Sequence, residues 1–203
     1  MIVTPPPIKT QGARFELQRG DALDQRLDGS DAVQERAMAL WRYTAPLVPM
    51  DYQTAQPWFA ALHQLSRMDA RFDARPPGFE LPEYAKTRFD GSAWSTGQPV
   101  LVSGSGTTIN VSGLSAEASF LQRGNYLSVT TAEGPELKMV MADVESDSNG
   151  TATISIQPPL RGTPTNITIT NPVCRFRLVS SAPYQLAPNR IVRITLEAIE
   201  SHG

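Results

Sequence analysis

A chain of 203 residues is long enough for one large domain or two small ones with buried cores. Its formal net charge of −2, with Lys and Arg scattered along the chain, excludes the basic surface that nucleic-acid binding requires. A single cysteine, Cys174, excludes an internal disulfide and a cysteine-based metal site, and 17 dispersed prolines favour short strands joined by turns over a disordered linker.

Residues Met1–Gly12 are predicted to form an extended, proline-rich arm. Met1–Pro7 lacks the basic and apolar regions of a secretory signal peptide, and no apolar segment of the sequence is long enough to span a membrane. We therefore expect the protein to be made in a bacterial-type cytoplasm and to stay there until another component carries it out.

Two strands are predicted before the first helix. Arg14–Arg19 alternates polar and apolar residues, which is typical of a half-buried strand. Asp21–Asp31 is rich in turn-forming residues and is predicted to be a loop. Arg36–Leu47 is predicted to be a strand covered on both faces, because apolar residues occupy both. One face carries Ala37, Ala39, Trp41, Tyr43 and Ala45, and the other carries Met38 and Leu40.

One helix is predicted, between about Thr54 and Met68. Apolar residues recur through this segment at the spacing of a single buried stripe. Thr54 is expected to cap the N-terminus, so that Pro57 lies in the first turn, where its missing N–H costs little. The residues predicted to be buried are Trp58, Ala61, Leu62, Leu65 and Met68.

After Asp90 only short strands are predicted. The preceding segment, Arg71–Lys86, is expected to be irregular because of Pro76, Pro77 and Pro82. Short strands separated by Gly, Asn and Pro are typical of a small barrel or sandwich. They are predicted at Val100–Val102, Thr107–Val111, Tyr126–Thr130, Lys138–Val144, Thr151–Gln157, Asn166–Thr170 and Arg175–Val179.

The last predicted strand, Asn189–Glu200, has the most regular alternation in the chain. The first section has too few strands for a closed core, and a strand returning from the C-terminus would complete its sheet. The sequence therefore predicts a mainly β protein with one helix, in which residues 1–90 and 180–203 form one β module. Residues 91–179 are predicted to form an inserted small β-barrel or sandwich.

Two motifs resemble ligand-binding loops only in part. Glu145–Gly150 matches the first half of a calcium loop, but the position of the bidentate glutamate is Ile156. A hairpin turn at Asn149-Gly150 is the better interpretation. Ser103–Thr107 is glycine-rich but lacks the Gly-Lys-Ser/Thr of a phosphate-binding loop, and we expect an ordinary loop there.

No catalytic, cofactor or metal site is predicted. Cys174 alternates with apolar residues and is expected to be a small core residue, and the two histidines, His63 and His202, are too few for a histidine metal site. Nothing in the sequence singles out a carboxylate pair for glycoside hydrolysis. The acids available for such a pair are Asp90, Glu117, Asp143 and Glu145.

Trp94 is the candidate ligand contact. Trp41 and Trp58 are expected in the core, whereas Trp94 lies between two serines and is expected to be exposed, where its ring could stack on a sugar.

The stretch Asp147–Leu178 combines a turn, a strand ending in Pro158–Arg161, a second strand and the alternating segment Cys174–Leu178. This order resembles the C-terminal part of the distal tail proteins of long-tailed bacteriophages (siphophages). Arg67–Phe72 departs from the pattern of that family, so the loop after the helix is expected to run differently. Other segments in the family's order are Arg14–Arg19, Ala39–Arg42, Leu47–Met50, Ala55–Leu62, Trp94–Gln98 and Leu121–Leu127.

The resemblance implies a structural virion protein and no enzyme activity. Distal tail proteins form a ring, commonly a hexamer, that joins the end of the tail tube to the hub, baseplate or fibre. The resemblance implies that residues 1–90 with 180–203 make the ring as a tube-like β-sandwich or split-barrel module, and that the inserted module of residues 91–179 faces outward. The implied partners are further copies of the chain, the tail tube protein, the hub or baseplate, and the tape measure protein, without nucleic acid or membrane. The implied location is the tail tip of the virion. In such a ring Arg161 could be held by a carboxylate of a neighbouring subunit, or it could cap a loop.

Two other functions remain open from the sequence. The inserted module could bind host carbohydrate or anchor a receptor-binding fibre, with Trp94 as a contact residue. A tail-associated hydrolase would need a carboxylate pair that the sequence does not identify.

Overall fold

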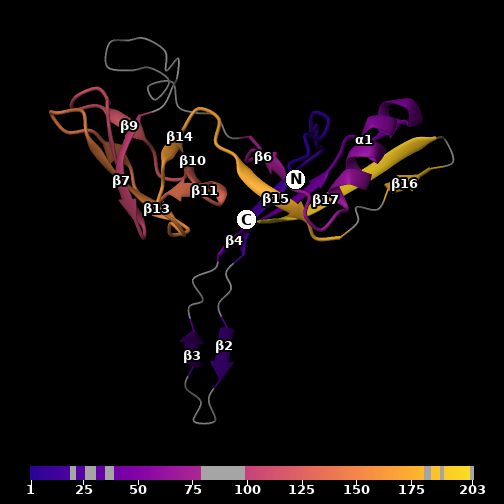
Figure 1. Ribbon diagram of the computed structural model, residues 1–203, viewed down its shortest axis with the longest axis horizontal. Coiled ribbons are helices and arrows are strands. Elements are labelled where there is room, and N and C mark those ends of the chain that lie inside the picture. Colours follow the sequence, from indigo (N-terminus) through magenta and orange to yellow (C-terminus); the bar gives the residue numbers. More distant parts are fainter. Residues whose placement is uncertain are drawn as a thin grey trace. The chain divides into compact units, whose positions relative to one another are not determined.

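The computed structural model describes residues 1–18, 22–25, 31–34, 39–78, 99–180, 184–187 and 190–201. Within these residues the protein is mainly β with a single helix, which confirms the predicted fold class. The described chain divides into two compact units (Figure 1). We call Met1–Asp73 with Phe176–Ser201 the terminal unit, and Ala74–Arg175 the inserted unit.

A seven-stranded sheet forms the terminal unit, with the C-terminal strand at its centre. This arrangement confirms the prediction that the last strand completes the sheet of the first section, since β17 pairs with β4 over five residues from Thr195 to Ile199. The main path of the sheet is β1 (Arg14–Gln18), β4 (Leu40–Pro46), β17 (Ile191–Glu200), β15 (Cys174–Leu178) and β6 (Phe72–Ala74), and β17 also pairs with β5 (Met50–Asp51) and β16 (Tyr184–Leu186).

Alternation along the central strands directs one face of the sheet into a core. Trp41, Tyr43 and Ala45 are buried, whereas the residues between them in β4 are only half-buried. Aromatic rings extend this core across the sheet. The ring centroids of Phe15 and Trp41 lie 4.9 Å apart, and those of Phe72 and Phe176 lie 5.9 Å apart.

Helix α1 (Tyr52–Leu65) contacts β5 and β17 and buries Ala55, Trp58, Ala61, Leu62 and Leu65. Two details of the predicted helix are wrong. The cap is Asp51, not Thr54, because the Asp51 carboxylate accepts the Thr54 N–H at 2.9 Å and the Thr54 hydroxyl at 2.7 Å. Met68 lies beyond the helix end and is 94% exposed, so it does not extend the buried stripe.

Two strands lie where irregular chain was predicted. Ala22–Gln25 (β2) pairs with Asp31–Gln34 (β3), although Asp21–Asp31 was expected to be a loop. Phe72–Ala74 lies beside β15 in the sheet, and the prolines that favour irregular chain begin only at Pro76. In both cases pairing with another strand stabilises a segment whose own sequence pattern is weak.

The inserted unit contains a six-stranded sheet that forms a nearly closed barrel. Its interior is a single apolar cluster that includes Ile109, Val129 and Ile154. A further pair of short strands, β9 (Ser119–Leu121) and β12 (Val144–Glu145), lies outside this path. The path runs β14 (Asn166–Thr168), β10 (Tyr126–Thr131), β11 (Gly134–Val140), β13 (Ala152–Gln157), β8 (Thr108–Ser112) and β7 (Val100–Ser105).

The glycine-rich segment forms the end of β7 and the turn after it. The expected loop is therefore wrong for Ser103–Ser105, and Gly106, with φ of 55°, makes the turn. A Cβ added to Gly104 would lie 2.9 Å from Pro164 Cγ and 3.0 Å from Leu160 Cδ1. Glycine at this position therefore lets β7 approach the segment that leads into β14.

Candidate functional site

The structure describes only one of the two residues that were predicted to contact a ligand or a neighbouring subunit. Trp94 lies outside the described residues, as does Asp90. Arg161 is half-buried in the loop after β13, where its backbone N–H donates to Glu136 Oε2 at 3.3 Å. Arg161 is thus bonded to its own unit, and its contact with a neighbouring subunit stays a prediction.

The acceptor of that bond belongs to a buried ion pair. Lys138 Nζ lies 2.7 Å from Glu136 Oε2, and the two side chains are 0% and 1% exposed. Lys138 also donates to the carbonyl oxygen of Pro159 at 2.8 Å. The pair therefore fixes the double-proline segment against β11.

Sequence reasoning missed this pair because charged residues two apart in a strand are normally on its solvent face. Glu136 and Lys138 instead share the strand face of Val140, which belongs to the apolar cluster of the inserted unit. Leu137, on the other face, is also buried, so β11 is covered on both faces. No local pattern in the sequence distinguishes such a strand from a half-exposed one.

The partial calcium motif is a turn, as predicted, but not a hairpin, because β12 (Val144–Glu145) pairs with β9 and β13 pairs with β8 and β11. Asp147 Oδ1 accepts the N–H groups of Asn149 and Thr151 at 2.8 and 2.9 Å, and the Thr151 hydroxyl donates to Oδ2 at 2.6 Å. Gly150 has a φ of 68°, which suits this turn. The Thr151 side chain is the main cause of a lowered pKa at Asp147.

The candidates Cys174, His63, Trp41 and Trp58 do not form a site. Cys174 is completely buried, which confirms it as a core residue, and His63 is exposed on α1. Trp41 and Trp58 are buried as predicted. Among the residues that the structure describes, no three His, Cys, Asp or Glu side chains are grouped so as to hold a metal ion.

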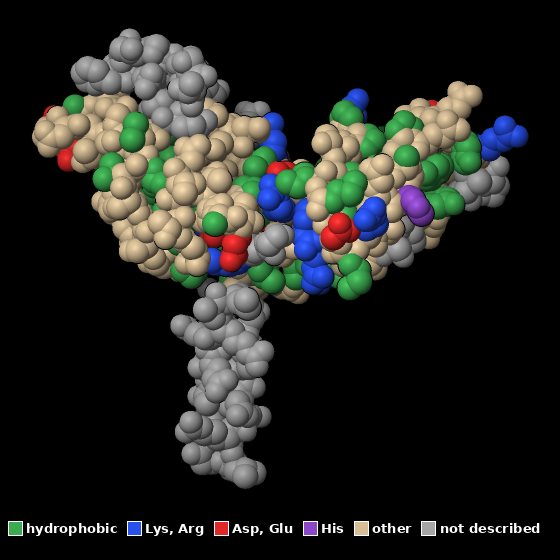
Figure 2. All heavy atoms as spheres, viewed as in Figure 1, with side chains coloured by type: hydrophobic (Ala, Val, Ile, Leu, Met, Phe, Trp, Pro, Cys, Tyr) green, Lys and Arg blue, Asp and Glu red, His purple; other side chains and the backbone are tan. Residues whose placement is uncertain are grey.

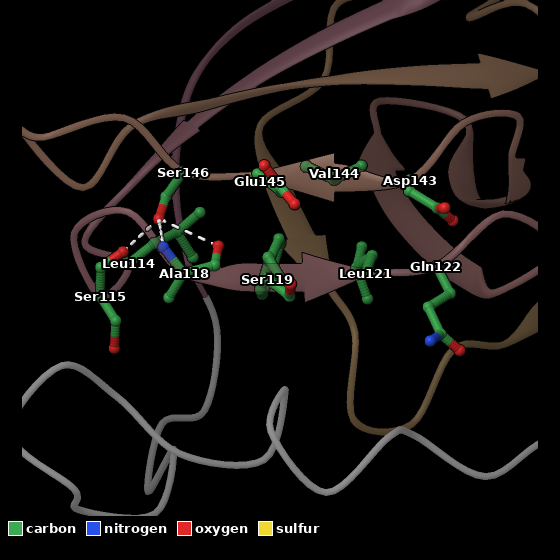
Figure 3. A pocket seen from close by; sticks show the side chains of 11 residues that line it. Leu114, Ser115, Ala118, Ser119, Leu121, Gln122, Asp143, Val144, Glu145 and Ser146 are labelled. Carbon is green, nitrogen blue, oxygen red and sulfur yellow. Dashed lines mark hydrogen bonds between the residues drawn. The ribbon is translucent and has the colours of Figure 1, made fainter.

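A pocket of about 370 Å³ lies along β9 and β12 of the inserted unit (Figure 3). Glu145 pairs with Ser119 across the two strands, while Gln122 and Asp143 lie together at one end of them. The apolar lining is largely buried in the core and comes from Leu114, Phe120, Leu121 and Val144.

Hydrogen bonds hold the frame of this pocket. The Ser146 hydroxyl accepts the N–H of Ala118 at 3.1 Å and donates to the carbonyl of Ser115. Asp143 Oδ1 accepts the N–H of Arg123 at 2.8 Å. In contrast, no described residue hydrogen-bonds the Glu145 carboxylate or the Gln122 side-chain amide.

On the face shown in Figure 2, few charged side chains lie on the described part of the inserted unit. No helix among the described residues has the length and apolar character needed to cross a membrane.

No known family model matches the chain, and no curated protein is significantly similar to it in sequence.

Proposed function

We propose that the protein is a structural subunit of a bacteriophage tail tip, which forms a ring at the distal end of the tail tube and joins the tube to the hub, baseplate or fibre. Its partners are further copies of the chain, the tail tube protein, the hub or baseplate, and the tape measure protein. It reaches the virion after assembly in the host cytoplasm.

The observation that carries this proposal is the open edge of the terminal-unit sheet. β1 pairs with β4 on one side, and no described strand pairs with its other side. An unpaired edge presents a row of backbone N–H and C=O groups that a second chain can satisfy. A head-to-tail contact made through such an edge closes into a ring when the rotation between subunits is correct.

The polar groups with the best-defined geometry support a structural role rather than catalysis. Glu136 and Lys138 hold the double-proline segment, and Asp147 holds a turn. Each of these groups bonds within its own unit. They therefore stabilise architecture and are not poised to act on a substrate.

The oligomeric state tests this proposal. We expect the purified protein, or the protein mixed with its tail tube protein, to form rings in electron micrographs, with a molar mass of several subunits by light scattering. Arg14→Glu is expected to weaken the ring, because Arg14 lies on the open edge, is 78% exposed and pairs with Glu16 at 3.0 Å. A protein that stays monomeric in both preparations would contradict the proposal.

Arg67→Glu is the matched control for Arg14→Glu. Arg67 is also exposed, at 63%, and also pairs with an acid two residues on, Asp69, at 3.4 Å. It lies after α1 and not on the sheet edge. We expect Arg67→Glu to leave the ring intact, and equal weakening by both variants would contradict the role of the β1 edge.

A further inference from the structure

We propose that an aromatic patch on α1 and β16 binds the proline-rich segment Thr4–Lys9 of a second copy of this chain. The patch consists of Tyr52, Phe59 and Tyr184, which all belong to the terminal unit. The inference deepens the proposed function and rests on it for the presence of neighbouring copies. It adds a contact between copies that is separate from the β1 edge.

The three rings of the patch form a continuous surface that solvent can reach. Tyr52 and Phe59 lie seven residues apart, hence on one side of α1, and their ring centroids are 5.6 Å apart. The ring centroid of Tyr184 lies 4.6 Å from that of Phe59. Tyr52 is 47% exposed and Tyr184 is 57% exposed. Aromatic side chains grouped at the surface in this way are typical of a contact with another protein.

A groove of about 640 Å³ borders the patch and supplies polar groups. Its described lining is Asp51, Tyr52, Gln53 and Arg190. The Arg190 guanidinium and the hydroxyls of Tyr52 and Tyr184 make no hydrogen bond to a described residue. All three groups can donate to a backbone carbonyl. The groove and the patch therefore suit a ligand that combines apolar rings with unpaired carbonyl groups.

The chain itself carries a segment of this chemistry in Pro5, Pro6 and Pro7. Proline has no N–H and a fixed φ, so consecutive prolines favour a polyproline II helix, which has no internal hydrogen bonds. Aromatic-lined grooves recognise this conformation. Pro7 is exposed and the other two prolines are half-buried, so the segment is accessible.

The segment is held at both ends by its own copy. The Val3 N–H donates to the carbonyl of Arg71 at 2.7 Å, and the Val48 N–H donates to the carbonyl of Lys9 at 3.0 Å. These bonds fix the segment before it meets a partner, which lowers the entropic cost of binding. Because the patch of the same copy stays exposed, the segment of that copy does not cover it.

A second copy is therefore the occupant that the chain offers. The segment and the patch are different surfaces of one chain, so a contact between them is head-to-tail, which is the type of contact that closes a ring. Charge also matches at one end of the segment. Lys9 is exposed, and Asp51 places a carboxylate in the groove.

The first test measures binding of a labelled peptide, residues 3–10, to the full chain by fluorescence anisotropy. The receiving protein carries Pro5→Ala, Pro6→Ala and Pro7→Ala, so that its own segments do not compete for the patch. We expect saturable binding, and much weaker binding of the same peptide with alanine at the three prolines. Adding Tyr52→Ala to the receiving protein should raise the Kd about tenfold, because an anchoring ring is lost.

Met68→Ala, made in the same receiving protein, is the control for Tyr52→Ala. Met68 is also apolar and exposed, at 94%, but lies beyond the end of α1 and outside the patch. Equal urea midpoints separate a loss of binding from a loss of folding, and Tyr184→Ala provides a second variant of the patch. The proposal is overturned if the peptide does not bind, if its alanine version binds as tightly, or if both patch variants bind like Met68→Ala.

Cross-linking tests whether the occupant comes from a second copy. Pro7→Cys and Gln53→Cys each add one accessible thiol, because the natural Cys174 is buried. Under mild oxidation the mixed variants should form a disulfide-linked dimer faster than either variant alone, and equal rates would overturn the contact. Rings without peptide binding would remove this contact and leave the proposed function standing. Peptide binding and cross-linking without rings would remove the ring and leave the contact.

Discussion

Lys138 and Glu136 form an ion pair that is withdrawn from water. Removing two charges from water costs free energy that their attraction only partly offsets, so such a pair contributes little net stability compared with apolar residues of the same volume. Breaking the pair is different, because the remaining charge stays buried without its counterion. The double-proline segment depends on this pair through the carbonyl of Pro159.

Lys138→Met is therefore expected to lower the free energy of unfolding by about 3–5 kcal/mol, because Glu136 is left buried without its cation. Urea denaturation followed by circular dichroism measures this change. Replacing both partners, with Lys138→Met and Glu136→Leu, should recover a large part of the loss.

Lys9→Met is the control for Lys138→Met, since Lys9 is exposed. Its effect should stay within about 0.5 kcal/mol. Equal effects at the two lysines would show that the buried pair does not carry the stability assigned to it.

Asp147 gives the inserted unit a pH dependence. Hydrogen bonds, first from the Thr151 side chain, lower its pKa below the usual value of 3.8 in the folded protein. The unfolded chain therefore binds a proton at higher pH than the folded one, so acid favours unfolding. This contribution is fully present above about pH 4 and is lost as the pH falls through the lowered pKa.

Asp147→Asn should consequently reduce the acid sensitivity of the inserted unit. Urea midpoints measured from neutral pH to below the usual carboxyl pKa should fall less steeply in the variant than in the unaltered protein. Asp51 has a lowered pKa for the same kind of reason and serves as an internal comparison in the terminal unit. If the urea midpoints of Asp147→Asn fall with pH as steeply as those of the unaltered protein, Asp147 is not the cause of the acid sensitivity.

At the scale of single elements, α1 shows that the apolar spacing of the sequence can continue past the last residue that packs on the sheet. Leu65 is the last buried residue of the helix and is 2% exposed, whereas Met68 continues the same sequence spacing but is 94% exposed. Helix α1 ends at Leu65, with Ser66 as its C-cap. Met68 therefore lies outside the helix and is not part of its buried face. A continued pattern of apolar residues therefore does not by itself extend a helix.

Leu65→Ala is expected to cost about 2–5 kcal/mol in unfolding free energy, because it leaves a cavity under the helix. Met68→Ala is expected to cost less than about 0.5 kcal/mol. Thermal or urea unfolding of the two variants side by side provides the measurement. A large effect at Met68 would mean that its side chain is buried in solution.

Some elements could be predicted from the sequence and others could not. Long strands with regular alternation, such as β17 and β13, and the amphipathic helix carry a strong periodic signal. β9 and β12 have only three and two residues, too few for a periodic signal, and β2 and β6 depend on their partners. The pocket could not be predicted for the same reason, since Ser119 and Glu145 meet only through the pairing of β9 with β12.

At the scale of the whole molecule, the chain enters and leaves the inserted unit through neighbouring strands. β6 leads into it and β15 leads out of it, and the two lie side by side in the sheet of the terminal unit. The rings of Phe72 and Phe176, just outside the two crossing points, have centroids 5.9 Å apart. A few residues are therefore enough to join the two crossing points directly.

Replacing Ala74–Arg175 by a short Gly-Ser linker is accordingly expected to leave the terminal unit folded. Phe72 and Phe176 stay in the shortened chain, so the aromatic core is kept. A cooperative unfolding transition and a β-type circular dichroism spectrum would support this expectation. An unfolded or aggregated product would show that the terminal unit requires the inserted unit.

The adjacency of β6 and β15 also has a consequence for how the protein can change over generations. A segment whose two ends meet can be lengthened, trimmed or exchanged by recombination without moving the strands on either side. Selection on the inserted unit can then proceed separately from selection on the terminal unit. In the tail-tip role proposed above, an exchange at this junction would alter the inserted unit while the sheet that carries the open β1 edge stays the same.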